Sequence, residues 1–207
     1  MRELGRWVLD RAAHQAAEWE RDGRAVSISV NLGRTELEDP QLPEAVADAL
    51  ESSGLSPHRL VLEIAEALLM RDPQANATRL AALKALGVRI AIDDFGTGYS
   101  TLTQLQLLPV DALKIDRSFV SGIANNPESG ALVHTLVQLG KTIGLETYAE
   151  GVEDTDQLRR LVREQCDRGQ GYLFARPLAL GDLEPLLAAD HPIGSLGVLA
   201  GDAPVGG

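Results

Sequence analysis

Residues 90–100 read Ile-Ala-Ile-Asp-Asp-Phe-Gly-Thr-Gly-Tyr-Ser, a nearly continuous apolar run that ends in two adjacent acidic residues and a glycine-rich turn. An apolar run without polar alternation is typical of a strand that is covered on both faces, as strands of parallel sheets are. Two ionised carboxylates after a buried strand repel one another unless a cation or hydrogen-bond donors offset the repulsion. The stretch therefore predicts a parallel strand with a functional site at Asp93 and Asp94.

Polar side chains follow short apolar runs at other places along the chain in the same way. In an α/β barrel, the carboxyl ends of successive strands converge on one mouth, so residues far apart in sequence can share a ligand. We therefore expect one composite site. Its predicted members are Asn31, Glu63, Asp93, Lys114, Glu150 and Gln170.

Strand patterns and helix patterns alternate along the whole sequence. Strands are expected at residues 26–31, 60–64, 88–92, 112–115, 146–150 and 169–172. Helices are expected at residues 3–21, 43–51, 76–86, 102–108, 129–143, 155–164 and 183–188. Asp154 is the expected N-cap of the helix at 155–164, since a short polar side chain there can accept a hydrogen bond from the first turn.

This alternation predicts an α/β protein with about six βα units in a parallel sheet. A doubly wound open sheet would explain the alternation too, and the length of 207 residues favours it. The acidic strand ends instead favour a TIM-like (β/α) barrel that is incomplete at the N-terminus, because a full barrel needs about 250 residues. We expect one N-terminally truncated domain at residues 1–190 and a flexible C-terminal tail at 191–207.

Composition narrows the possible partners and the cellular location. The net charge of −11 argues against a long nucleic acid, which needs a basic surface. A small anionic ligand remains compatible if a metal ion supplies positive charge. Cys166 is the single cysteine, so it can form no internal disulfide and no thiolate zinc site, and it is expected to be a buried structural thiol. No apolar run approaches a membrane span and no signal peptide opens the chain, which predicts a cytoplasmic protein.

Six short motifs in this order resemble the signatures of the EAL-domain family, whose active members hydrolyse the bacterial messenger cyclic di-GMP to the linear dinucleotide. An ordered series that extends over residues 3–187 is far more specific than any one motif. The motifs are Ser-Val-Asn-Leu (29–32), Leu-Glu-Ile-Ala-Glu (62–66), Asp-Asp-Phe-Gly-Thr-Gly-Tyr-Ser (93–100), Leu-Lys-Ile-Asp (113–116), Ala-Glu-Gly-Val-Glu (149–153) and Gln-Gly-Tyr-Leu (170–173).

The resemblance implies a site with two Mg²⁺ or Mn²⁺ ions. Asn31, Glu63 and Asp93 would hold one ion, and Asp94 would belong to the shell of the second. Glu150 would be either a ligand of the second ion or the catalytic base, two roles that the sequence leaves open. All of these donors are oxygen atoms, which hard divalent cations prefer.

The resemblance also implies catalytic and supporting roles for further residues. Lys114 would lie beside the attacking water and the phosphate, with Asp94 and Glu150 as its catalytic partners. Gln170 would orient water or a ligand oxygen, and Asp116 would be a further carboxylate at the rim. Glu66 would hold the loop after the acidic pair, where Gly96 and Gly98 let the backbone approach the site.

The sequence departs from the family pattern in its first signature. A Glu-Ala-Leu tripeptide with a following arginine is expected on an early strand, where it would supply a metal-binding glutamate and a phosphate-binding arginine. Residues 66–68 spell Glu-Ala-Leu, but they overlap the later signature at 62–66, so we interpret them as a coincidence. A smaller departure follows Asn31, where the chain reads Leu-Gly-Arg-Thr-Glu and relatives usually carry serine.

Two functional hypotheses follow, and a third is less favoured. The chain is expected to be a cyclic di-GMP phosphodiesterase that is impaired as given. Alternatively, it is a catalytically inactive EAL-like module that binds cyclic di-GMP or a protein partner. A phospho-acceptor receiver domain fits poorly, because its acidic pair would lie near the start of the domain. The resemblance further implies a homodimer and fusion to sensory or GGDEF-type domains in a longer chain.

Overall fold

The computed structural model describes residues 3–24, 26–98 and 101–188. By its internal contacts the chain divides into two compact units, Met1–Asp111 and Ala112–Gly207. In both units, parallel strands alternate with helices, as the sequence predicts.

The first unit contains three parallel strands in the order β1 (Ile28–Asn31), β2 (Leu60–Ala65) and β3 (Arg89–Phe95). Every connection between neighbouring strands includes a helix, as parallel pairing requires. The helical elements are α1 (Glu3–Arg21), α2 (Arg34–Leu37), α3 (Leu42–Ser53), the 3-10 helix η1 (Pro57–Arg59), α4 (Glu66–Leu69), α5 (Pro73–Lys84) and α6 (Leu102–Leu107).

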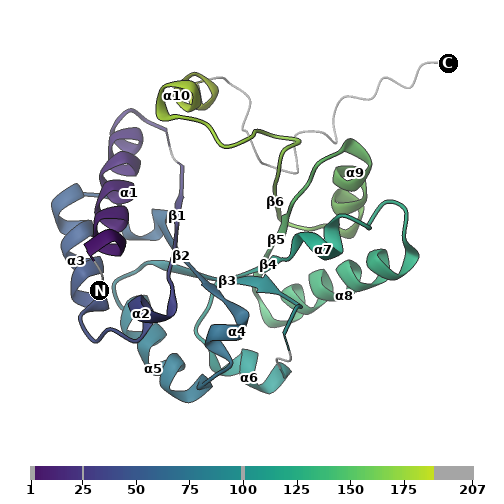
Figure 1. The fold of residues 1–207 in the computed structure, drawn as a ribbon, viewed down its shortest axis with the longest axis horizontal. Helices are drawn as coiled ribbons and strands as arrows, with labels where there is room; N and C mark the ends of the chain where they lie inside the picture. The colour runs from purple at the N-terminus through teal and green to yellow at the C-terminus, as the bar shows by residue number, and fades with distance from the viewer. Residues whose placement is uncertain (1–2, 25, 99–100, 189–207) are drawn as a thin grey trace. The chain divides into compact units, whose positions relative to one another are not determined.

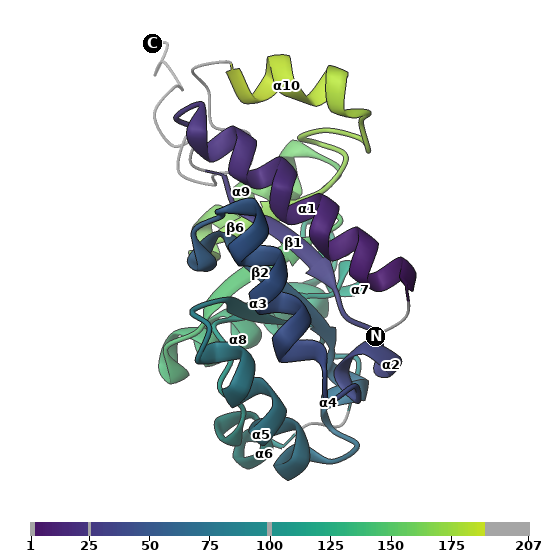
Figure 2. The same ribbon diagram turned by 90° about the vertical axis from the view of Figure 1, so that its left-hand side faces the viewer.

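The core of the first unit lies between its strands and its longer helices. Figure 1 shows α1, α3 and α5 on one side of β1–β3, and Figure 2 shows α1 and α3 lying side by side. Strands β2 and β3 are buried along most of their length, with Leu62, Ile64, Ile90 and Ile92 fully buried. Helix α1 contributes Leu9 and small residues such as alanine, which allow close packing. The strands that carry the predicted site therefore pack closely against the helices of this unit.

The second unit repeats the pattern with the parallel strands β4 (Ala112–Ile115), β5 (Glu146–Glu150) and β6 (Arg168–Gln170). Its helices are α7 (Arg117–Val120), α8 (Pro127–Ile143), α9 (Thr155–Glu164) and α10 (Leu180–Ala188). The hydrophobic core of this unit joins α8 and α9 to the strands through Ile115, Val133, Val137, Ala149 and Leu158. Cys166 belongs to the same core, which confirms the expected buried thiol.

All six predicted strands are present, and the bounds of β4, β5 and α9 agree with those expected. Helix α5 begins three residues earlier than expected, because Asp72 caps it by accepting a hydrogen bond from the backbone N–H of Ala75. The short elements α2, η1, α4 and α7 were missed, since three or four residues cannot display a helical period. The predicted tail at 191–207 lies outside the described residues. Among the helices described, none combines the length and apolarity that a bilayer crossing requires.

Removing the N-cap of α9 is expected to destabilise the second unit. The Asp154 carboxylate accepts hydrogen bonds from the backbone N–H groups of Asp156 and Gln157, and Gln157 completes a capping box. We expect Asp154→Ala to lower the free energy of unfolding by about 1 kcal/mol. Asp156→Ala is the control, because Asp156 is exposed and pairs only with Arg159, a contact worth about 0.5 kcal/mol. Equal losses in urea unfolding of the two variants would contradict the capping role.

Candidate functional site

The first unit brings three predicted site residues to the carboxyl ends of its strands. Asn31 is paired with Glu63 in the register of β1 and β2, and Asp93 is paired with Ala65 in the register of β2 and β3. Glu63 and Ala65 lie two positions apart and so project from the same face of β2. Asn31, Glu63 and Asp93 therefore share one face at one edge of the three strands.

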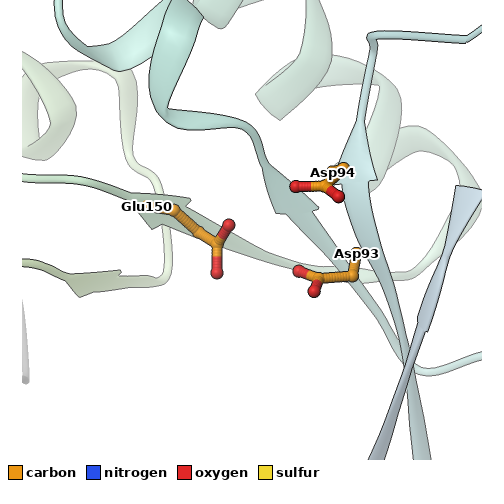
Figure 3. Close-up of side chains that lie close together, drawn as sticks. All are labelled: Asp93, Asp94 and Glu150. Carbon is orange, nitrogen blue, oxygen red and sulfur yellow. The ribbon is translucent and has the colours of Figure 1, made fainter. Parts of the chain in front are cut away.

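Asp94 joins this edge through an uncommon backbone conformation. Neighbouring side chains along a strand normally point to opposite faces. Asp94 has a positive φ of 53°, in the left-handed region that aspartate tolerates better than most residues. Its carboxylate offers an oxygen within 4.8 Å of one from Asp93. Figure 3 shows both carboxylates projecting to the same side of the end of β3.

The backbone after the acidic pair is held by Glu66, the first residue of α4. Its carboxylate is almost completely buried, with 1% of the residue exposed. The atom Oε2 accepts hydrogen bonds from the backbone N–H of Gly96, at 2.9 Å, and from that of Gly98, at 3.2 Å. These contacts are the ones that a loop-holding glutamate requires. Glu66-Ala67-Leu68 lies in α4 and not on a strand, in agreement with our interpretation of residues 66–68.

The second unit carries an ion pair at the ends of its strands, between a buried lysine and a partly exposed glutamate. Lys114 is paired with Tyr148 in the register of β4 and β5, so Glu150, two residues beyond Tyr148, lies on the same face. The Lys114 Nζ atom is 2.6 Å from Glu150 Oε1, and 5% of the lysine side chain is exposed. Figure 3 shows Glu150 at the end of β5. At this distance the ammonium donates a charge-assisted hydrogen bond to the carboxylate.

Gln170 lies opposite Glu150 in the register of β5 and β6. Its position depends on a close backbone approach that our sequence analysis did not identify. Val152 N–H donates to Gln170 O, and Leu173 N–H donates to Val152 O. A Cβ atom at Gly171 would stand 2.3 Å from Val152 N, so only glycine fits between these segments. The signal in the sequence was the glycine after Gln170, but the sequence does not reveal the segment it faces.

Asp116 lies at the start of α7, where it acts as the N-cap. Its carboxylate accepts hydrogen bonds from both the backbone N–H and the hydroxyl of Ser118. Partial burial by itself would raise the pKa of Asp116, but the hydrogen bonds from Ser118 and the nearby Arg117 bring the pKa below its ordinary value. Asp116 is therefore ionised at neutral pH and fixes the chain direction just after β4.

The donor set at these strand ends fits hard divalent cations. Asn31 offers an amide oxygen, and Glu63, Asp93, Asp94 and Glu150 offer carboxylate oxygens. None of these residues is a thiol or an imidazole, the groups that favour zinc or copper. The lone thiol, Cys166, is buried in the core, and burial raises its pKa above the ordinary value, so it is protonated at neutral pH.

A parallel βα scaffold with acidic and amide side chains at its strand ends has the oxygen donors of a domain that holds divalent metal ions. The EAL domain family model matches residues 1–177. The chain belongs to the EAL domain family.

Two curated bacterial signalling proteins are similar to this chain over most of its length. An uncharacterized signaling protein of Caulobacter vibrioides is 45% identical over 189 residues, which are 91% of this chain and 23% of that protein. The bifunctional diguanylate cyclase/cyclic di-GMP phosphodiesterase MucR of Pseudomonas aeruginosa is 42% identical over 188 residues, 90% of this chain and 27% of MucR. The chain thus spans about a quarter of the length of these curated relatives.

A solved structure described as PaMucR phosphodiesterase in complex with c-di-GMP superposes with a TM-score of 0.84. It is 42% identical to this chain, and the match covers 87% of this chain and 74% of that one. Together with the alternation of parallel strands and helices, this likeness confirms the predicted fold class, six βα units of a TIM-like barrel.

Gly98→Ala is expected to disturb the contact between Glu66 and its loop. A Cβ atom at Gly98 would lie 2.8 Å from Glu66 Oε1 and 2.9 Å from Glu66 Cδ, so the buried carboxylate has to move. We expect this overpacking to lower the free energy of unfolding by about 1–3 kcal/mol. Gly181→Ala is the matched control, because a Cβ atom there meets no atom within 4 Å. If both variants unfold at the wild-type urea concentration, Glu66 does not require the space at Gly98.

Proposed function

We propose that this chain hydrolyses cyclic di-GMP to linear pGpG in bacterial second-messenger signalling, with divalent metal ions. The observation that supports this most strongly is the set of side chains at the strand ends: a shared face of Asn31, Glu63 and Asp93 in one unit, and the Lys114–Glu150 pair in the other. A relative is named as a cyclic di-GMP phosphodiesterase, and a solved relative is described as its complex with c-di-GMP.

In this proposal, Asn31, Glu63 and Asp93 would hold one Mg²⁺ or Mn²⁺ ion, and Asp94 would belong to the shell of the second, with Glu150 either a ligand of that ion or the catalytic base. The ions would supply an activated water and would neutralise charge on the scissile phosphate. The protein's part is to fix the donors before the ions arrive. The strand register does this for the first set, and the positive φ of Asp94 does it for the acidic pair.

Lys114 and Glu150 would act on the negative charge of the phosphate and on the proton of the attacking water, respectively. The Lys114 ammonium donates to Glu150 Oε1 and would also donate to a phosphate oxygen as negative charge develops there. If Glu150 is the base, it would accept the proton of the attacking water at a carboxylate oxygen. Gln170 would orient a ligand oxygen through its amide, and Asp116 would support the chain after β4.

The proposal extends to the setting of the domain. Relatives are several times longer than the matched region, which supports fusion to sensory or GGDEF-type domains in a longer chain. We also propose a homodimer and a cytoplasmic location, since cyclic di-GMP is a second messenger inside the cell. The single EAL domain at residues 1–190 remains our proposal for the domain boundary.

The metal requirement gives a direct test. We expect hydrolysis of cyclic di-GMP by the purified protein to need Mg²⁺ or Mn²⁺ and to stop on chelation. Asp93→Asn is expected to lower kcat at least ~100-fold, because it removes a charged oxygen aimed at the reacting centre. Asp156→Asn, an exposed acidic site on α9, is the control and should retain full activity. Chromatographic detection of pGpG measures both, and metal-independent hydrolysis would contradict the proposal.

A second candidate function is binding of cyclic di-GMP, or of a protein partner, without turnover. The motif pattern keeps this candidate open, because none of the strands in the described part of the chain carries the family's Glu-Ala-Leu signature. The two candidates differ in turnover. We expect the 207-residue protein to hydrolyse cyclic di-GMP at least ~100-fold more slowly than an EAL domain that carries this signature. Turnover at the rate of such a domain would exclude the second candidate, and tight binding without pGpG would establish it.

A further inference from the structure

Asn76 is a buried polar residue that none of the roles above uses. It lies in the first half of α5 with 3% of its surface exposed. Its Nδ2 atom donates hydrogen bonds to the backbone carbonyls of Leu68, at 3.3 Å, and of Leu69, at 3.0 Å. Its Oδ1 atom accepts a hydrogen bond from Arg79 Nη1 at 2.8 Å. The amide is thus held at its oxygen and points its donors at another helix.

The two carbonyls belong to the last residues of α4, a helix of only four residues. The final carbonyl groups of a helix have no partner within it, and short helices gain little stability of their own. Leu68 O also accepts a hydrogen bond from the backbone N–H of Arg71, at 3.5 Å, so it is chiefly Leu69 O to which Asn76 supplies a donor from α5. Leaving the buried Leu69 carbonyl without this donor is unfavourable, so α4 depends on Asn76 for the position of its C-terminal end.

The other end of α4 is Glu66, whose carboxylate holds the backbone N–H groups of Gly96 and Gly98. Both ends of this helix are therefore fixed by buried polar side chains, Asn76 at one end and Glu66 at the other. One turn of helix has no room to absorb a shift between them. A displacement of the C-terminal end of α4 would be carried to the Glu66 carboxylate.

The loop that Glu66 holds follows directly after the strained residue of the acidic pair. Asp94 has a positive φ, a conformation that persists where the surrounding structure holds it in place. On its C-terminal side, Thr97 donates to Asp94 O within the turn, and the hydrogen bonds from Gly96 and Gly98 to Glu66 tie that turn to α4. Without them the backbone at Asp94 could relax toward a regular strand, which would turn its carboxylate away from that of Asp93.

We infer that Asn76 is a positioning residue for the Asp93–Asp94 carboxylate pair and that it acts through α4 and Glu66. The use of that pair for metal binding rests on the proposed function, whereas the mechanical connection rests on the contacts within the first unit alone. A change at Asn76 is therefore expected to alter the loop at Gly96 and Gly98, although Asn76 touches neither residue.

Hydrogen exchange of the full 207-residue protein without metal tests the mechanical connection. Asn76→Asp keeps the size of the side chain but replaces its two N–H donors with an oxygen that faces carbonyls. We expect the amides of Gly96 and Gly98 to exchange at least ~10-fold faster in this variant, because local opening governs their protection. Unchanged protection of these two amides in a folded variant would overturn the inference.

Two further variants separate positioning from general loss of stability. Leu80→Ala removes a fully buried core side chain from the same helix without touching α4's terminal carbonyls. Compared at the same interval below its own Tm, this variant should leave the amides of Gly96 and Gly98 protected. If these two amides exchange as fast in Leu80→Ala as in Asn76→Asp, Asn76 has no specific role. If Asn76→Asp does not fold, Arg79→Ala replaces it, since it removes the donor that orients the amide. Exchange at Gly96 and Gly98 should then rise at least ~3-fold, and no rise would refute the inference.

A metal titration then connects this result to the site. In Asn76→Asp, the Mn²⁺ concentration needed for half-maximal binding should rise several-fold, whereas Leu80→Ala should bind as the wild type does. Faster exchange with unchanged Mn²⁺ affinity would keep the mechanical connection and contradict the use of the acidic pair for metal. Slow exchange with weakened Mn²⁺ binding would overturn the route through α4 and leave the proposed function standing.

Discussion

The parallel register of β1, β2 and β3 is the constraint from which the first unit's site follows. Because side chains alternate along a strand, a slip of one residue in β2 would send Glu63 to the opposite face and separate it from Asn31 and Asp93. The buried apolar residues of β2 and β3 prevent that slip, since it would expose them to water. Core packing and the placement of the polar edge are thus the same constraint.

Stability does not explain the Lys114–Glu150 pair as it explains the strand register, because an ion pair with a buried member adds little to stability. Removing two charges from water costs several kcal/mol, and apolar replacements of such pairs are often as stable or more so. The 2.6 Å contact between Nζ and Oε1 limits this cost but does not explain why charges occupy the position. The role proposed for the pair in hydrolysis would explain it, since an ammonium held beside a carboxylate at a strand end is already oriented for a charged ligand.

Much of the fold could be predicted because short stretches of sequence determine the type and the ends of its helices and strands. Apolar runs indicate the six strands, and Asp154 indicates the start of α9 because its carboxylate can cap the first turn. The order of motifs also identified the residues of the candidate site. What escaped prediction depends on tertiary partners: α4 is too short for a periodic signal, and Gly171 is explained only by the approach of Val152. Asn76 gave no signal either, because the carbonyls that make it important come from another helix.

Charge explains why the proposed site needs cations in addition to shape. The residues assigned to it carry four carboxylates and one ammonium, in a chain whose net charge is −11. A cyclic dinucleotide with two phosphate groups is itself an anion, so the protein alone would repel it. Divalent ions held by these carboxylates would reverse the local sign. Metal binding and dinucleotide binding at the proposed site should therefore be coupled, with each strengthening the other.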